Sequence, residues 1–279
     1  MADTKLINLT EITNPALADI LYLTADPGST PLDRKCTLTN LQSLLAAGGW
    51  MAADALTYAT SDAPTYTVTC TGNQTAKYYP GMRLKLTDST VKYFIITDVA
   101  YTSSTTLTLY GGTDYTLSGG AITSPYYSSA KAPTGFPLNK AKWTVTLEDT
   151  TSRSQAATQS TYYSPGALSI TVPIGAWNFG ARYSMRAAGG QAGQVQIQSG
   201  IQTVNNNITD LALSAFMTGY TYTNTAELVQ TVNLQKYILL ASKTVYYPVI
   251  VSFQNSGTTT IYFANDKSTM IVEAICAYL

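Results

Sequence analysis

Hydrophobic and polar residues alternate with a period of two over much of the chain, a pattern typical of half-buried β-strands. Residues 65–70 alternate threonine with larger apolar side chains, residues 105–110 repeat the pattern, and residues 91–96 form a buried apolar run. About five short strands in roughly 80 residues predict a small β-barrel or sandwich over residues 55–137. Residues 124–133, rich in tyrosine and proline, are interpreted as an irregular exit from this unit.

The strand pattern resumes in residues 138–279 and predicts about eight more strands. Eight strands in roughly 140 residues are typical of a jelly-roll-like β-sandwich. Residues 270–278 form the closing strand, and we expect it in the middle of a sheet or between subunits. An apolar strand of this kind at an exposed edge would promote aggregation.

Residues 1–48 follow a different pattern, with short helical segments around a β-hairpin. Asn14 and Pro15 are typical of an N-cap and first helical position, and residues 20–24 and 32–38 predict two strands. Residues 39–42 match a capping box that opens a second helix. A segment this small cannot bury its leucines and isoleucines alone. It needs a partner surface, which is either the next domain of the same chain or another protein.

Charge is low and balanced, with 16 basic and 16 acidic residues that make up 11% of the 279-residue chain. This share is less than half of the usual one. A chain of this kind cannot neutralise many phosphates, so nucleic acid is not an expected partner. A surface made of hydroxyl and amide groups instead suits a particle surface or an oligomer whose subunits must not repel one another.

The absence of histidine removes the commonest general base and metal ligand. The three cysteines, Cys36, Cys70 and Cys276, are far apart and form no CxxC motif, so neither a zinc site nor a disulfide framework is expected. We therefore expect no cofactor and no metal. The chain has no signal-peptide pattern and no apolar stretch of about 18 residues, so no membrane association is expected.

Acidic residues are few and scattered. Glu148, Asp149, Asp210 and Asp266 lie where strands end or turns begin, which is where turn formation alone favours carboxyl and amide side chains. A glycosidase-like pair of carboxylates is not excluded by spacing, but we interpret these residues as structural and expect no enzyme activity. Paired tyrosines, such as Tyr78 with Tyr79, fit either sugar stacking or packing with one ring inward, and packing is the favoured interpretation.

Several stretches resemble structural proteins of tailed bacteriophages. Residues 12–23 (ITNPALADILYL), with residues 26–31 and 35–41, are similar to the opening module of many fibre, spike and head-decoration proteins, which fastens the subunit to the virion. Residues 79–86, 91–96, 110–117 and 131–137 resemble a β-module of phage structural proteins, and the pattern around Trp177 and the closing strand is similar to trimeric jelly-roll tips. The residues that the resemblance assigns to virion anchoring are Pro15, Leu17, Ile20, Leu21, Tyr22, Asp26, Pro27, Leu38, Leu41 and Leu44. Those assigned to a trimer core are Trp177, Phe179, Ile271 and Ile275.

Taken together, these features predict an all-β virion protein with three parts: an anchor at residues 1–48, a middle domain at 55–137 and a tip domain at 138–279. The resemblance implies a homotrimeric head fibre or decoration protein that contacts phage capsid or tail proteins and is assembled in the host cytoplasm. The alternative is a tail-tip receptor-binding protein that recognises a glycan on the host surface. A glycan depolymerase is a third, weaker hypothesis.

Overall fold

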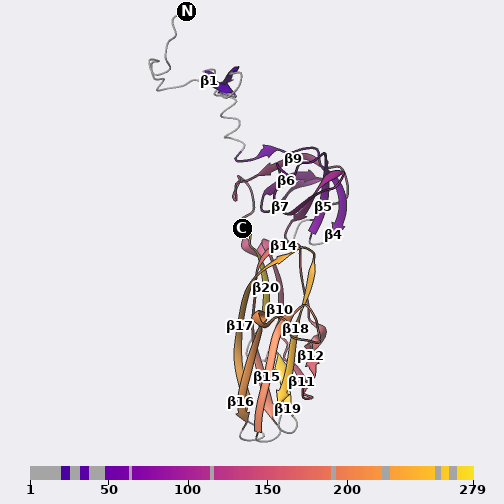
Figure 1. The fold of residues 1–279 in the computed structure, drawn as a ribbon, viewed down its shortest axis with the longest axis vertical. Helices are drawn as coiled ribbons and strands as arrows, with labels where there is room; N and C mark the ends of the chain where they lie inside the picture. Colours follow the sequence, from indigo (N-terminus) through magenta and orange to yellow (C-terminus); the bar gives the residue numbers. More distant parts are fainter. Residues whose placement is uncertain are drawn as a thin grey trace, which may run out of the picture.

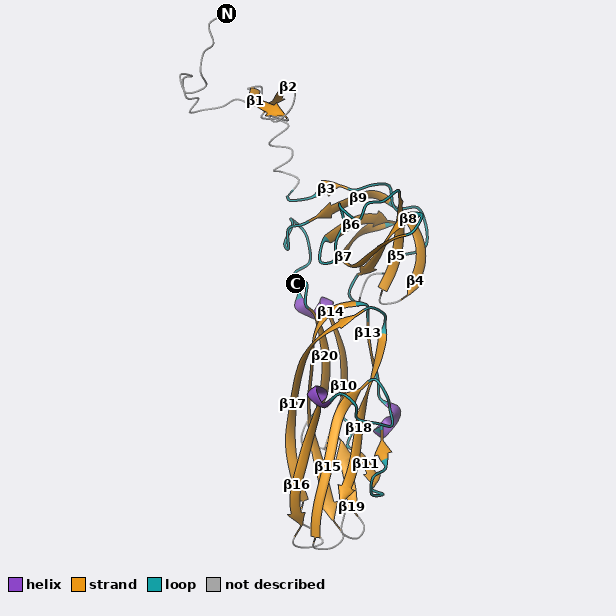
Figure 2. Ribbon diagram, in the orientation of Figure 1, coloured by secondary structure: helices purple, strands orange, loops and turns teal. Residues whose placement is uncertain are grey.

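The computed structural model describes residues 20–25, 32–37, 48–62, 65–113, 116–189, 193–221, 227–254, 259–263 and 269–279. Within these ranges the protein is all-β, with antiparallel sheets and no α-helix (Figure 2). Among the described residues, three short 3-10 turns interrupt the strands: η2 (Lys140–Trp143), η3 (Pro165–Ala167) and η4 (Leu211–Leu213). Near the start of the chain, β1 (Ile20–Ala25) and β2 (Leu32–Thr37) pair with each other.

The middle of the chain folds into one seven-stranded sheet that curls into a half-barrel. Its spatial order is β3-β9-β6-β7-β8-β5-β4. The strands are β3 (Met51–Ala52), β4 (Thr57–Asp62), β5 (Thr65–Thr71), β6 (Arg83–Asp88), β7 (Thr90–Tyr101), β8 (Ser104–Tyr110) and β9 (Thr123–Ser128). Val68, Leu84, Phe94 and Leu107 are fully buried on its concave side.

This sheet corrects two sequence-based expectations. The predicted barrel or sandwich is a single open sheet, because β3 and β4 occupy its two ends and do not pair with each other among the described residues. The segment interpreted as an irregular exit contains β9, which lies between β3 and β6. The strand tolerates Pro125 because its register with β6 shifts between Lys85 and Thr87, opposite the proline. Prolines within sheets are typically found at such irregularities or at edges.

The rest of the chain forms a long sandwich of two sheets beneath the half-barrel (Figure 1). The front sheet has the order β10-β20-β14-β19-β11, with β17 on the other edge of β14, and the back sheet has the order β12-β18-β15-β16, with β13 also paired to β18. The front strands are β10 (Thr144–Asp149), β11 (Arg153–Ala156), β14 (Gly175–Gly189), β17 (Glu227–Leu240), β19 (Thr259–Phe263) and β20 (Met270–Cys276). The back strands are β12 (Tyr162–Tyr163), β13 (Ile170–Val172), β15 (Gly193–Gln202), β16 (Ser214–Thr221) and β18 (Thr244–Gln254).

Three strands are each interrupted into two pieces, β10/β11, β12/β13 and β19/β20. When each is counted as one strand and the strands are numbered along the chain, the front sheet runs 1-8-3-6 and the back sheet 2-7-4-5. The closing strand β20 lies between β10 and β14, so the prediction that it is internal to a sheet is confirmed.

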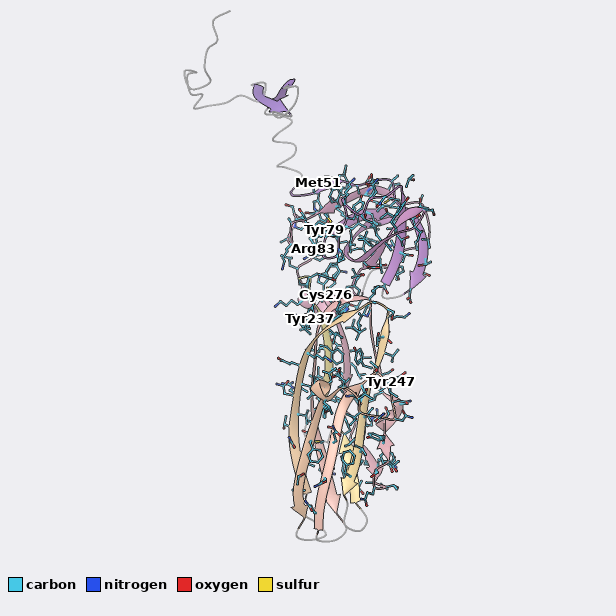
Figure 3. The ribbon with its side chains drawn as sticks, in the orientation of Figure 1. Met51, Tyr79, Arg83, Tyr237, Tyr247 and Cys276 are labelled. Carbon is cyan, nitrogen blue, oxygen red and sulfur yellow. The ribbon has the colours of Figure 1, made fainter. Side chains whose placement is uncertain are left out.

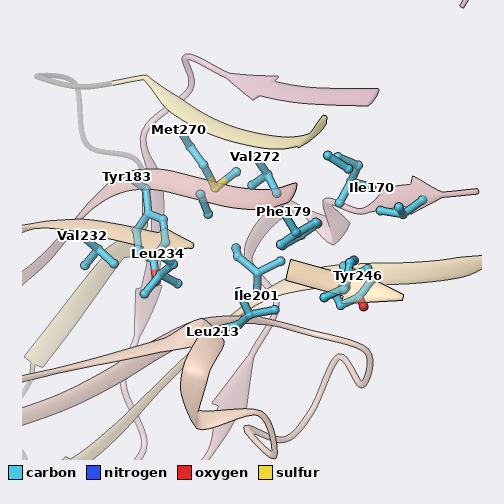
Figure 4. Close-up of a cluster of buried hydrophobic side chains, with 14 of the residues drawn as sticks. Ile170, Phe179, Tyr183, Ile201, Leu213, Val232, Leu234, Tyr246, Met270 and Val272 are labelled. Atoms are coloured by element: carbon cyan, nitrogen blue, oxygen red, sulfur yellow. The ribbon is translucent and has the colours of Figure 1, made fainter. Parts of the chain in front are cut away.

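The sandwich core is built from alternate residues of these strands. Phe179 and Tyr183 of β14 face Ile201 of β15 and Tyr246 of β18, and Val272 of β20 covers them (Figure 4). All five are buried within a single chain. The inner face of the closing strand is therefore covered by the chain's own core.

The half-barrel and the sandwich share one apolar core at their junction. Tyr110 of β8 packs against both Trp143 and Trp177, with ring centroids 5.9 and 5.0 Å apart, and Phe136 stacks on Trp143 at 5.2 Å. Trp50 belongs to the same cluster. Gly112 lies so close to η2 that a Cβ atom there would be 2.4 Å from the Lys142 carbonyl oxygen, which excludes any other residue at this position.

A buried arginine fastens the junction. The Arg83 side chain is 1% exposed and donates to three carbonyl oxygens: from Nη1 to Gly81 (2.6 Å), from Nε to Lys131 (3.0 Å) and from Nη2 to Tyr278 (2.8 Å). Its guanidinium also lies 4.9 Å from the centre of the Phe136 ring. The residues that follow β20 are thereby bonded directly to the half-barrel.

Candidate functional site

The outer face of the front sheet carries a row of polar side chains along its middle strand. In β14 the residues Trp177, Phe179 and Ala181 point into the core, so the alternation directs Asn178, Gly180 and Arg182 outward.

Strand register places these outward residues beside those of the neighbouring strands. Gly180 lies opposite Gln235 of β17 on one side and Glu273 of β20 on the other. Asn178 lies between Tyr237 and Ile275, and Arg182 lies between Asn233 and Ile271. Because Gly180 has no side chain, it forms the floor of a depression between two raised rows.

Two adjoining hollows of about 360 and 310 Å³ occupy this depression, and both are lined by Gly180, Gln235 and Glu273. We call their union the Gly180 groove. It extends from Asn178 to Arg182, four residues along the strand, which is about 14 Å at a rise of about 3.4 Å per residue.

The polar side chains of the groove have no partners within the described part of the chain. Asn178, Arg182, Gln235 and Glu273 form no side-chain hydrogen bond or ion pair with any described residue. Tyr237 stands at one end with 60% of its surface exposed. Lys236 also lines one hollow but is paired with Asp210. The groove thus offers hydrogen-bond donors and acceptors side by side, with one unpaired cation, one unpaired anion and one aromatic ring.

A second exposed surface lies where the half-barrel meets the sandwich. Leu239 is 72% exposed, and with Pro80, Ile174 and Tyr278 it forms an apolar area, bordered by Thr97 and Asp98, that we call the waist patch. A hollow of about 390 Å³ opens within it. Figure 3 labels Tyr79 on the half-barrel, above this junction, and Tyr237 on the sandwich, below it.

Comparisons with known proteins identify no family. No family model matches the sequence, and no curated protein matches it. Among solved structures, latent PorU from Porphyromonas gingivalis is 10% identical, with a TM-score of 0.27 over 84% of this chain and 25% of the PorU chain. The VP2 subviral particle of infectious bursal disease virus is 10% identical, with a TM-score of 0.25 over 84% of this chain and 81% of that chain. The CBM22 tandem domain of Paenibacillus barcinonensis Xyn10C is 11% identical, with a TM-score of 0.21 over 96% of this chain and 99% of that one. Similarity at this level supports no inference about function.

The four residues assigned to a trimer core fall on two sides of the front sheet. Trp177 and Phe179 are 0% and 1% exposed within one chain, and the Trp177 indole donates to the Pro173 carbonyl at 2.8 Å, so neither has surface left for a second copy. Ile271 and Ile275 point outward, half-buried, on either side of Glu273 in the groove. Their role in a contact between copies stays a prediction.

Most of the anchoring residues lie outside the described part of the chain. This holds for Pro15, Leu17, Asp26, Pro27, Leu38, Leu41 and Leu44. Ile20, Leu21 and Tyr22 lie in β1, of which the structure describes the backbone pairing.

The carboxylates considered at the sequence level have structural partners where they are described. Two hydrogen bonds from Arg153, at 3.0 and 3.1 Å, lower the pKa of Asp149. Asp210 caps η4 and pairs with Lys236 at 2.5 Å, whereas Glu148 is exposed and Asp266 lies outside the described residues. Among the residues that the structure places, no three acidic or thiol side chains gather as metal ligands, and no helix there is long and apolar enough to cross a membrane.

Sequence reasoning missed the groove because its parts come from three distant strands. An isolated glycine in a strand pattern is a signal of close backbone approach, and Gly180 was such a signal. Gln235 and Glu273 become its neighbours only through the register of β17 and β20.

Proposed function

We propose that this chain is a structural subunit of a bacteriophage virion, a homotrimeric head fibre or decoration protein that projects from the particle surface. The waist patch carries this proposal. Leu239 of the sandwich is largely exposed and lines the same hollow as Pro80 of the half-barrel, and exposed apolar areas of this kind mark protein–protein contacts. A closed ring of copies would bury the patch on every subunit.

The architecture supports the same function. The strand succession 1-8-3-6 and 2-7-4-5 is that of two Greek keys, so we interpret the sandwich as a jelly roll, a fold common in capsid and lectin domains. The shared aromatic core and Arg83 make the half-barrel and the sandwich one stiff body. A stiff, charge-poor projection suits a role that consists of holding a position on a particle.

The test is the mass of the purified full chain in solution, with three times the chain mass of 29.9 kDa expected. Leu239→Glu places a charge in the waist patch and should shift the mass to that of one chain. Leu211→Glu is the matched control, since Leu211 is 71% exposed on η4 and is not part of the patch. A wild-type chain that stays monomeric at all concentrations, or that is absent from purified particles, overturns the proposal.

A tail-tip receptor-binding protein is the second candidate, and the Gly180 groove is the observation that favours it. The two candidates share the trimeric architecture and differ in whether the projection has a ligand. Adsorption of the purified protein to host cells separates them, because a decoration protein alone should not bind the cell surface. Neither candidate function includes an enzyme activity.

A further inference from the structure

We propose that the Gly180 groove binds a neutral oligosaccharide. This inference names the ligand class that the second candidate function requires, but it does not depend on a trimer or a virion, since every residue that it uses comes from the front sheet of a single chain. Its starting point is a glycine that the fold itself does not explain.

Gly180 lies in the interior of a long strand, where glycine weakens a sheet. Its backbone is not in the left-handed region, and an added Cβ would meet nothing closer than the Leu234 carbonyl oxygen at 3.4 Å. Alanine would therefore fit in the folded chain. Gly112, by contrast, is required by a contact at 2.4 Å. A strand glycine without an internal reason points to something outside the chain that approaches the backbone closely.

The side chains around Gly180 define the chemistry of that ligand. Gln235 and Asn178 offer amide donors and acceptors, Glu273 only acceptors and Arg182 only donors, and none is paired within the described chain. An apolar partner would remove them from water without replacing the lost hydrogen bonds, which is unfavourable. A sugar hydroxyl both donates and accepts, so it can pair with any of these groups.

The charge and shape of the groove narrow the class of ligand further. The charges of Arg182 and Glu273 cancel, and Lys236, which also lines one hollow, is paired with Asp210. The groove therefore has no excess of positive charge with which to hold a sulfated or otherwise polyanionic chain. The exposed ring of Tyr237 at one end can pack against the apolar face of a sugar ring. The groove is elongated, and its two hollows share their central residues, which fits a short linear oligosaccharide better than a single sugar.

The test uses the labelled full chain on a glycan array that contains neutral, sialylated and sulfated saccharides. We expect binding to at least one neutral class. Gly180→Phe fills the groove and should lower this binding at least tenfold, whereas Gly180→Ala should retain it. Thr218→Phe is the matched control, because Thr218 is an exposed residue of β16 in the back sheet. Circular dichroism and the thermal midpoint establish that each variant is folded.

Three results would overturn the inference: no neutral glycan bound by the folded wild-type protein, retention of sulfated or sialylated glycans only, or binding that Gly180→Phe leaves unchanged. The mass of each variant in solution is measured in parallel. If the wild-type protein binds no glycan and the Gly180→Phe variant loses subunits, the groove is a contact between copies instead. A monomeric wild-type protein that binds a neutral glycan through the groove would contradict the proposed trimer and leave this inference intact.

Discussion

Replacing Arg83 by methionine tests whether the half-barrel and the sandwich act as one body. Methionine keeps an apolar stem of similar length but removes all three hydrogen bonds to the carbonyl groups of Gly81, Lys131 and Tyr278. These acceptors come from both units, and the position is 1% exposed, so water cannot replace the lost donors without opening the junction.

The expected loss of stability is the difference between the stabilisation lost with the three hydrogen bonds and the cost of burying the guanidinium, which the variant no longer carries. Hydrogen bonds from a charged group stabilise by about 1.5–3 kcal/mol each, so the three bonds are worth about 4.5–9 kcal/mol. Burying the guanidinium costs several kcal/mol, a cost that methionine does not carry. Burial is also why the pKa of Arg83 is lower than its ordinary value. We expect the variant to be less stable by about 2–4 kcal/mol.

Urea unfolding followed by tryptophan fluorescence measures this change at the right place, because all three tryptophans of the chain, Trp50, Trp143 and Trp177, belong to the shared core. Arg182→Met is the control, since the Arg182 side chain is exposed and has no partner in the part of the chain that the structure describes, and a change within about 0.5 kcal/mol is expected there. If Arg83→Met unfolds at the same urea concentration as the control, the junction is not held by Arg83 and the rigid coupling is refuted.

Three further predictions concern single residues. Gly180→Ala should raise the free energy of unfolding by about 0.5–1 kcal/mol, because alanine loses less conformational entropy on folding, and an unchanged or lower thermal midpoint would mean that the Cβ does not fit. Burial alone would raise the pKa of Asp88, but hydrogen bonds from Ser118 and Lys92 outweigh it and lower the pKa below the ordinary 3.8. The free energy of unfolding that Asp88 contributes should therefore be constant between about pH 5 and 8 and fall below about pH 4. Asp88→Asn should make the loss of stability below about pH 4 less steep. Cys70 and Cys276 are buried, and burial raises the pKa of the Cys276 thiol to about 11. In a Cys36→Ser variant neither thiol should therefore react with a thiol reagent before the protein unfolds. An absorbance assay of the released chromophore follows the reaction.

The sequence predicted strands well wherever one face of a strand is buried and the other is not. In β20 the alternation of Met270, Val272, Ala274 and Cys276 with more exposed residues matches the buried and half-buried positions of the structure. The same holds for β5 and β8. The period-two pattern carries this information because side chains on a strand alternate between the two faces of a sheet.

The failures come from features that a local pattern does not contain. β9 has a proline and mostly polar residues, and it becomes a strand because β3 and β6 offer partners and a register shift accommodates Pro125. Gln202 is a second case. It is fully buried, and its amide accepts from the backbone of Thr209 and Asp210 and donates to the carbonyl groups of Asp210 and Leu213, so one side chain organises the connection to β16. Nothing around residue 202 in the sequence predicts this network.

The outward residues of β17 explain how one face can serve two partners. Along this strand Gln235 is followed by Tyr237 and then by Leu239, so the exposed surface changes from polar to apolar toward the half-barrel. The apolar end needs protein to cover it, whereas the polar end is already compatible with water and with a hydroxyl-rich ligand. A trimer that closes at the waist would leave the Gly180 groove open. Leu239→Glu should therefore separate the copies without loss of glycan binding, and Gly180→Phe should do the reverse. If either substitution abolishes both properties in a folded protein, the two surfaces are one site and the division along β17 is wrong.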